Sequence, residues 1–322
     1  MLQWQEDQIK EWEAYLPDLT AQADFDAFWD RTLDITRKNP LRPLMERVDY
    51  PSAFVEVFDI SYCGFDETRV GGWLVLPTFV HKDHIPCLIQ YHGFTGDRGK
   101  PADLMHWVVQ GMAVLSIDCR EQGGVTGNAA VYSDSGMVSN VTSKGILHED
   151  QYYYRAVYMD CLKAIDFTLT VPQVDPEKIV IHGGSQGGAL GMAVCALDDR
   201  PCAGLVNVPS NSDLVARVRG RHGSFHAVND YVRRYPDQLE RALTTLSYFD
   251  TMNMAHKIKC PIYASVGMCD PVCPPKCYYA SYNRITSPKK IENYPFNEHD
   301  GAWGVHKEKS MRFLREIGVI DG

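Results

Sequence analysis

The sequence contains no apolar run near the roughly 18 residues that a membrane-spanning helix requires. Its first 16 residues alternate apolar with charged side chains and include no apolar core like that of a secretory signal. Basic residues are in the minority, with 32 Lys and Arg against 41 Asp and Glu, so the formal net charge is -9. Nucleic-acid-binding proteins neutralise phosphates with clustered basic side chains. We therefore expect a cytoplasmic protein that binds neither a membrane nor nucleic acid.

The ten cysteines are interpreted as thiols, because the expected location is reducing. Several lie in apolar stretches, where a buried thiol behaves as a small hydrophobic side chain. Cys269, Cys273 and Cys277 form a regularly spaced series, but three prolines interrupt it. Zinc sites usually combine short Cys or Cys/His pairs. The sequence therefore predicts no metal site.

Short apolar runs alternate with helical stretches from residue 86 onward. The strand-like runs are 87–91, 113–117, 178–181, 261–266 and 291–296, and helical patterns include 105–109, 152–169, 189–197 and 306–317. This alternation predicts an α/β fold with a mostly parallel central sheet flanked by helices. Residues 55–60 and 73–77 precede it as two antiparallel strands at one sheet edge. A length of 322 residues permits two domains, yet one large α/β domain over 1–322 is the interpretation we adopt.

Three segments depart from this alternation. An N-terminal extension of about residues 1–50 contains a predicted helix at 24–38, which we expect to cap the sheet. Residues 121–145 are rich in Gly, Ser, Asn and Thr and are predicted to form a long loop. Residues of about 210–255 are helical and rich in arginine, so they are interpreted as an insertion over the sheet with a solvated charged face.

Residues 183–187 read Gly-Gly-Ser-Gln-Gly and match the G-x-S-x-G motif of a nucleophile elbow. The motif follows the strand at 178–181 and precedes the helix at 189–197, which is the context that it needs. The sharp turn leaves no room for side chains two residues before and after the serine, and both positions are glycine. A glycine-rich turn that holds a serine by chance is the alternative. We predict that Ser185 is a nucleophile.

A serine nucleophile requires an imidazole to remove its proton and a carboxylate to orient that imidazole. In hydrolases with this elbow the chain order is serine, acid, histidine. Asp270 follows the strand at 262–266, and His299 follows the strand at 290–296. The carboxyl ends of parallel strands are where sites form in α/β folds. The predicted triad is therefore Ser185, Asp270 and His299.

Other acids and histidines fit these roles less well. Asp250 lies in a helical context, and Asp300 adjoins the predicted base too closely to orient it. His306 begins the last predicted helix and is expected to be solvated. His92 precedes the nucleophile in the chain, and His182 is interpreted as a packing residue.

The oxyanion formed during acyl transfer requires two backbone N–H donors. Gln186 follows the nucleophile at the start of a helix, and Tyr91 belongs to a Tyr-His-Gly sequence after the strand at 87–89. We predict that the backbone N–H groups of Tyr91 and Gln186 form the oxyanion hole and that Tyr91 contacts the substrate. This chemistry needs neither a metal nor an organic cofactor.

The chain resembles carbohydrate esterase family 7, the acetyl xylan esterases and cephalosporin C deacetylases. The similar segments extend over nearly the whole chain: residues 48–51, 72–77, 91–93, 144–147, 152–155, 183–188 and 246–250. The resemblance implies a serine esterase that removes acetyl groups from small acetylated carbohydrates, such as xylo-oligosaccharides, and from cephalosporin-type esters. It also implies a homohexamer whose active sites face an internal cavity.

Two positions depart from the family's usual sequence. Arg120-Glu121-Gln122 replaces Arg-Gly-Gln, and His299-Asp300 replaces His-Glu. The missing glycine puts a side chain where the backbone needs freedom, although neither change removes a triad residue. An esterase or peptidase of other acyl specificity on the same fold is the alternative function, and a non-catalytic binding module that keeps the fold is another.

Overall fold

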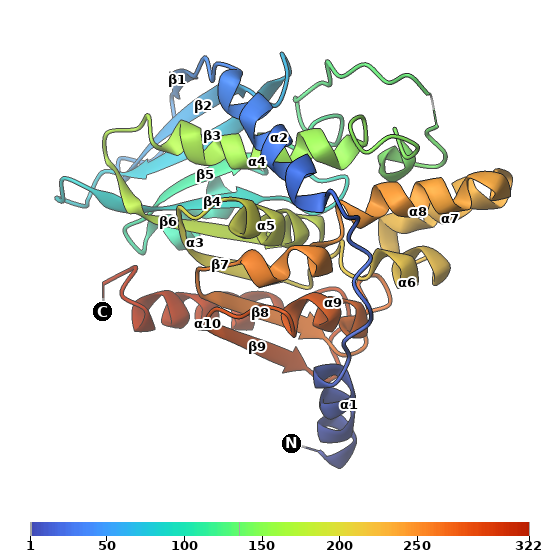
Figure 1. Cartoon of the computed structure of the whole chain (residues 1–322). Helices are drawn as coiled ribbons and strands as arrows, with labels where there is room; N and C mark the ends of the chain where they lie inside the picture. The colour runs from blue at the N-terminus through green and yellow to red at the C-terminus, as the bar shows by residue number, and fades with distance from the viewer. Residues whose placement is uncertain (1, 135, 322) are drawn as a thin grey trace.

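The computed structural model describes residues 2–134 and 136–321, and within them nine strands form one sheet (Figure 1). Their order across the sheet is β1-β2-β3-β5-β4-β6-β7-β8-β9. The strands are β1 (Leu44–Val48), β2 (Val55–Cys63), β3 (Arg69–Pro77), β4 (Ile85–Tyr91), β5 (Ala113–Ile117), β6 (Val174–Gly184), β7 (Pro201–Asn207), β8 (Ile262–Gly267) and β9 (Lys289–Tyr294). The predicted mostly parallel α/β sheet is confirmed.

The pairing directions follow the sequence patterns. β4, β5, β6, β7, β8 and β9 pair in parallel, whereas β1, β2 and β3 are antiparallel, and β3 joins the parallel part by an antiparallel pair with β5. Every residue of β5 and β8 is buried. Strands covered on both faces are continuously apolar, so these two were detectable as uninterrupted apolar runs.

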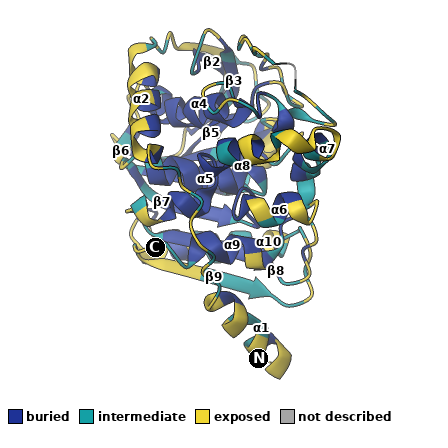
Figure 2. Cartoon of the chain, turned by 45° about the vertical axis from the view of Figure 1, so that its right-hand side comes forward, coloured by how far each residue is buried: buried dark blue, intermediate teal, exposed yellow. Residues whose placement is uncertain are grey.

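Helices pack on both faces of the sheet, and further helices lie outside these two layers (Figure 1). The helices are α1 (Gln3–Glu13), α2 (Phe25–Lys38), α3 (Met105–Val108), α4 (Tyr153–Thr168), α5 (Gln186–Leu197), α6 (Leu214–Arg219), α7 (His226–Arg234), α8 (Leu239–Ser247), α9 (Pro275–Tyr282) and α10 (Trp303–Glu316). Side chains of α4, α5 and α9 belong to one hydrophobic cluster, and those of α3 and α10 belong to a second. Figure 2 shows α4 and α5 buried in the middle of the fold. In the described residues, no helix is both long and apolar enough to cross a bilayer.

The N-terminal extension packs against helices. The indole Nε1–H of Trp29 in α2 donates to the Tyr248 carbonyl at 3.1 Å, and its ring lies 5.9 Å from that of Tyr158 in α4. The expectation that this helix caps the sheet is therefore corrected, because α4 lies between them. The sequence patterns did not predict α1, which contacts α9 through Trp12 and Tyr279.

The segment at 210–255 contains α6, α7 and α8 and lies beyond the carboxyl ends of the parallel strands (Figure 1). Most of its arginines are exposed, as expected: Arg219, Arg221, Arg233, Arg234 and Arg241. Arg217 is the exception, because only 1% of its surface is exposed. The prediction of a solvated charged face is therefore wrong for this residue.

Candidate active site

Ser185 lies in the turn between β6 and α5 with φ 58° and ψ -120°. A non-glycine residue in this left-handed region is strained, which is the conformation that the elbow motif predicts. A Cβ atom on Gly183 would lie 2.4 Å from the carbonyl carbon of Gly187, and one on Gly187 would lie 2.0 Å from the carbonyl oxygen of Tyr91. Side chains at these two positions would clash with the backbone, so the packing around Ser185 requires both glycines.

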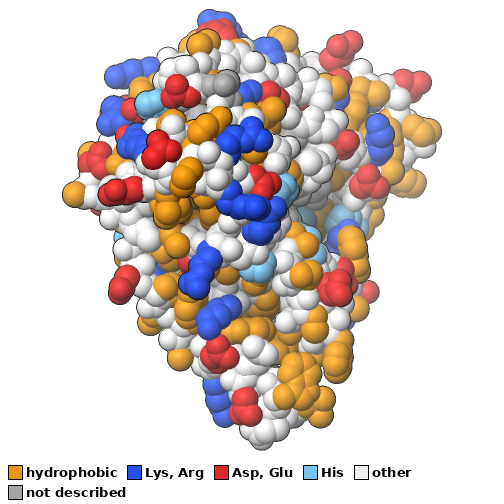
Figure 3. Space-filling model, turned by 90° about the vertical axis from the view of Figure 1, so that its right-hand side faces the viewer, with side chains coloured by type: hydrophobic (Ala, Val, Ile, Leu, Met, Phe, Trp, Pro, Cys, Tyr) orange, Lys and Arg blue, Asp and Glu red, His pale blue; other side chains and the backbone are white. Residues whose placement is uncertain are grey.

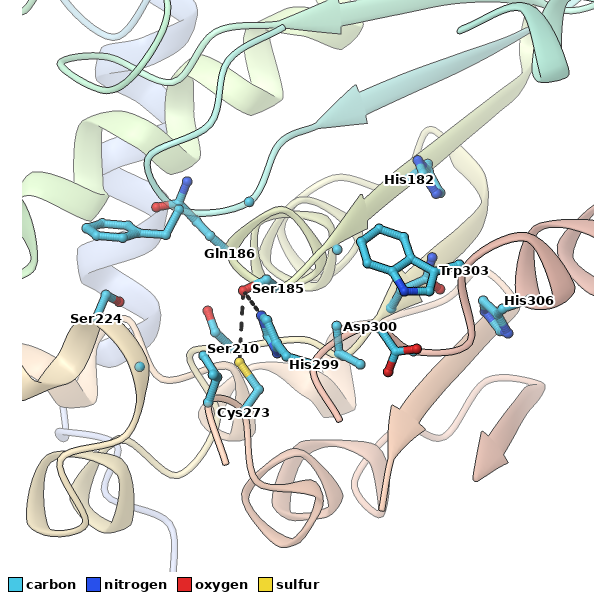
Figure 4. Close-up of a pocket in the computed structure, with 18 of the residues that line it drawn as sticks. His182, Ser185, Gln186, Ser210, Ser224, Cys273, His299, Asp300, Trp303 and His306 are labelled. Carbon is cyan, nitrogen blue, oxygen red and sulfur yellow. Dashed lines mark hydrogen bonds between the residues drawn. The ribbon is translucent and has the colours of Figure 1, made fainter. Parts of the chain in front are cut away.

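The loops after β8 and β9 bring Asp270 and His299 to Ser185, and Figure 4 shows the hydrogen bond between His299 and Ser185. His299 Nε2 lies 2.8 Å from Ser185 Oγ, and His299 Nδ1 lies 2.7 Å from Asp270 Oδ2. Asp270 Oδ1 accepts hydrogen bonds from the backbone N–H groups of Val272 and Cys273, which fix the carboxylate. The three residues thus form a continuous hydrogen-bonded chain in the predicted order.

The surroundings of His299 favour its protonated form. Burial by itself disfavours the imidazolium, but the hydrogen bond to Asp270 and the adjacent sulfur of Cys273 outweigh burial and raise the pKa of His299 above its ordinary value. Such an environment suits an imidazolium, which is the form that a general base takes after it accepts a proton.

The two residues expected to form the oxyanion hole belong to the elbow itself and to the end of the neighbouring strand β4. Gln186 is the first residue of α5, where backbone N–H groups lack partners within the helix. Its side-chain Oε1 accepts from Tyr154 and Gln122, which hold it in place. Tyr91 ends β4, and its phenol donates to the Cys161 carbonyl inside the core. Any substrate contact by Tyr91 must therefore come from its backbone.

Glu121 takes the conformation for which glycine is suited. Its φ is 58°, and its carboxylate binds Lys144 Nζ at 2.7 Å and Asn128 Nδ2 at 2.7 Å. The next residue, Gln122, still donates to Gln186 at 2.9 Å. The structure thus accommodates the missing glycine by anchoring the new side chain. Asp300, the other departure, accepts from Asn297 and does not bond to the histidine.

The remaining histidines are placed by packing. His306 was expected to be solvated, but it is 1% exposed and stacks on Tyr263, and burial lowers its pKa to about 4. This expectation was wrong because α10 turns that side chain onto the sheet. His182 packs against Trp107, as expected for a packing residue. Both ring nitrogens of His92 bond to backbone groups, those of Gly93 and Cys119.

Ser185 lines a cavity of about 750 Å³. Figure 3 shows the hollow on this face, with histidine side chains gathered around it. Cys273 Sγ lies 4.0 Å from Ser185 Oγ, and Trp303 and Arg217 also line the cavity. The sequence patterns assigned none of these three residues to the site. The position of Cys273 three residues after Asp270 was a usable signal, whereas Arg217 had none.

The cysteine series does not converge on one point. Cys269 is exposed, whereas Cys273 and Cys277 are buried. In the described ranges, Asp270, Cys273 and His299 are the group whose potential metal-ligand atoms all lie within 4.8 Å of one another. A metal there would have to replace the hydrogen bonds that join Asp270, His299 and Ser185.

Arg120 anchors the loop that carries Gln122. Its guanidinium binds Asp160 at 2.7 Å with side chains 0% and 2% exposed, and it binds Asp66 at 2.9 Å. Removing one partner of such a pair leaves a buried charge uncompensated. We expect Arg120→Met to lower the free energy of unfolding in urea by about 3–5 kcal/mol. Arg31→Ala is the control, because Arg31 and its partner Asp150 are 50% and 54% exposed, and it should cost less than about 1 kcal/mol. Equal losses in the two variants would contradict this account.

Known proteins match this chain over almost its full length. The sequence model of the acetyl xylan esterase (AXE1) family matches residues 4–317. Acetyl esterase Axe7A of Xylanibacter ruminicola is 30% identical over 287 residues, which are 86% of this chain and 63% of that protein. The chain thus spans less than two thirds of this relative's length.

Two solved structures superpose closely on the chain. The acetyl xylan esterase from Paenibacillus sp. R4 has a TM-score of 0.92 and 38% identity, with 95% of this chain and 98% of that chain covered. Acetyl xylan esterase 1 from Thermoanaerobacterium sp. JW/SL YS485 has a TM-score of 0.90 and 27% identity, with 96% and 98% covered. The predicted α/β-hydrolase fold is confirmed.

Proposed function

The chain belongs to the acetyl xylan esterase (AXE1) family, and from this premise we propose that it is a serine esterase that removes acetyl groups from small acetylated carbohydrates. The observation that carries the proposal is the hydrogen-bonded chain from Ser185 through His299 to Asp270, in which Ser185 and His299 line a cavity. Xylo-oligosaccharides are the proposed substrates, by analogy with the named activity of the relatives.

The proposed reaction has two halves. His299 Nε2 takes the proton from Ser185 Oγ as the oxygen attacks the acetyl carbonyl, and the Tyr91 and Gln186 N–H groups bind the oxyanion. The imidazolium then gives its proton to the departing alcohol, which leaves an acetyl-serine. His299 next deprotonates a water molecule that attacks this ester, and acetate is released as the proton returns to Ser185. Asp270 keeps the imidazole oriented throughout.

Acyl selectivity tests the proposal against a longer-chain esterase on the same fold. 4-Nitrophenyl acetate, butyrate and octanoate share one leaving group, so differences in kcat/KM report the acyl site alone. We expect kcat/KM to fall by about tenfold or more from acetate to butyrate, because a site shaped for acetyl excludes added methylenes. A preference for octanoate would contradict deacetylation. Preferential cleavage of an acylated peptide would support the peptidase alternative.

The proposal also includes features that rest on the family resemblance or on sequence composition. These are activity on cephalosporin-type acetyl esters, a homohexameric assembly, a cytoplasmic location, and one α/β-hydrolase domain over residues 1–322 with its helical insertion at about 210–255. A non-catalytic binding module is disfavoured, because the hydrogen bonds between Ser185, His299 and Asp270 are in place.

A further inference from the structure

Arg217 is a buried cation at the wall of the cavity that contains Ser185. It projects from α6, and only 1% of its surface is exposed. An ion pair requires a nitrogen–oxygen distance of at most 4.0 Å. Across residues 2–134 and 136–321, no carboxylate oxygen lies that close to the Arg217 guanidinium. The Phe225 ring centroid lies 5.5 Å from Arg217 Cζ and offers a cation–π contact, but it carries no formal counter-charge. Burying a charge without a counter-charge is costly, so the position of this guanidinium requires an explanation.

The hydrogen bonds of the guanidinium leave donors unused. Nη2 donates to the Val272 carbonyl at 3.1 Å and contacts Cys273 Sγ at 3.6 Å. Nε is buried without a partner, and Nη1 has none among the described residues. Arginine presents its donors as a planar fork that matches a carboxylate. Among the described residues, Nη1 is therefore free to bind an anion from outside the protein, because the Cys273 sulfur contacts Nη2 and Nε is fully buried.

The carboxylates near Arg217 are occupied elsewhere. Asp213 accepts from the Tyr15 hydroxyl and from the N–H of Ala216. Asp250 accepts from the N–H groups of Asp213, Leu214 and Met252. Asp270 accepts from His299 and from two backbone N–H groups. Each of these acids is held by other donors, so none is free to turn towards the guanidinium.

Arg217 lies close to the nucleophile Ser185 and away from the outer surface of the protein. Cys273 Sγ lies 3.6 Å from Arg217 Nη2 and 4.0 Å from Ser185 Oγ, so one sulfur atom separates the guanidinium from the nucleophile. In Figure 4, Cys273 lies directly below Ser185, whereas Asp300 and Trp303 lie to the right. Asp300, an acidic residue of the cavity wall, accepts from Asn297, and within the described residues it forms no ion pair with Arg217.

We propose that Arg217 binds a carboxylate carried by the substrate, so that the enzyme prefers acetyl esters whose alcohol part is anionic, such as acetylated sugar acids. The proposal rests on the deacetylase function proposed above. Because the acyl group is then acetyl, the carboxylate belongs to the alcohol that leaves. The site is selective because a neutral alcohol leaves the buried guanidinium without a counter-charge.

A matched pair of substrates tests this selectivity. 3-Acetoxybenzoate and 3-acetoxybenzamide have similar shapes, and they differ by one negative charge on the leaving alcohol. We expect kcat/KM for the benzoate to exceed that for the benzamide by roughly 10- to 100-fold, the range of a hydrogen bond to a charged group. Arg217→Gln should abolish this ratio, and Arg217→Lys should keep part of it. Arg219→Gln removes an exposed arginine from the same helix and should leave the ratio unchanged.

A measurement on the unmodified protein covers the case in which Arg217→Gln does not fold. Benzoate should inhibit hydrolysis of 4-nitrophenyl acetate at roughly tenfold or more lower concentration than benzamide does. Equal inhibition together with equal hydrolysis of the two acetoxy substrates would overturn the proposal. Failure to hydrolyse 4-nitrophenyl acetate at all would instead contradict the deacetylase function.

Discussion

Replacing Ser185 with alanine is expected to lower kcat for 4-nitrophenyl acetate by roughly a million-fold, which is the loss seen when a serine triad acts as a unit. Ser185 Oγ is positioned to attack the carbonyl carbon and to give its proton to His299 Nε2 at 2.8 Å. Without it, the acetyl-serine cannot form. The rate of 4-nitrophenol release measures the effect directly.

Two further measurements on Ser185→Ala separate lost chemistry from lost folding. The variant should melt at nearly the same temperature as the unmodified protein, because alanine keeps the backbone and removes one oxygen. A fluorophosphonate probe should label the unmodified protein at Ser185 and leave the variant unlabelled. Substantial hydrolysis by pure variant, or unchanged labelling, would show that another residue is the nucleophile.

Replacing Asp270 with asparagine is expected to lower kcat by about 10,000-fold while leaving the fold intact. Asparagine keeps the oxygen that accepts from Val272 and Cys273, but its amide then faces His299 Nδ1. The amide N–H makes Nδ1 an acceptor and places the imidazole proton on Nε2, which can no longer take the serine proton. Initial rates with 4-nitrophenyl acetate measure this loss.

The pH profile of Asp270→Asn gives a second readout. Burial lowers the pKa of His299, whereas Asp270 raises it, and catalysis requires the neutral imidazole. The unmodified enzyme therefore loses activity as the pH falls through the raised pKa. Removing the carboxylate lowers that pKa, so the residual activity of the variant should persist to lower pH.

Asp300→Asn is the matched control for Asp270→Asn. Asp300 adjoins the histidine in the chain, yet its carboxylate accepts from Asn297 and makes no hydrogen bond to His299. We expect kcat to change by less than about tenfold, because loss of a peripheral hydrogen bond is worth about 1 kcal/mol. A loss as large as that of Asp270→Asn would assign the orienting role to Asp300.

The sequence was most informative where local backbone demands are strict. The strand at 113–117 was predicted with the bounds that the structure gives, because a strand buried on both faces is apolar throughout. The elbow was predictable because a strained serine between a strand and a helix leaves no room for side chains at Gly183 and Gly187. Chain order and strand ends were enough to select Asp270 and His299 as the acid and the base of the predicted triad.

Patterns failed where the partner of a residue lies far away in the chain. His306 was expected to face solvent, yet its ring stacks on Tyr263, 43 residues earlier in the numbering. Helix α1 was missed because its buried residues, Gln5 and Trp12, do not form a continuous apolar stripe. Burial at such positions depends on which part of the protein the helix packs against. The spacing of apolar residues within the helix does not specify that partner.

Ser185 and Arg217 show what the sequence determined and what the tertiary structure determined. The sequence by itself determined the α/β fold, the elbow and the order of the predicted triad, because these follow from local geometry and from the periodicity of apolar residues. Only the tertiary structure decided that His299 reaches both Ser185 and Asp270, and that Arg217 alone of the insertion's arginines lies buried beside Cys273. Those distances depend on the packing of loops and helices from separate parts of the chain, which the composition of any one segment does not specify.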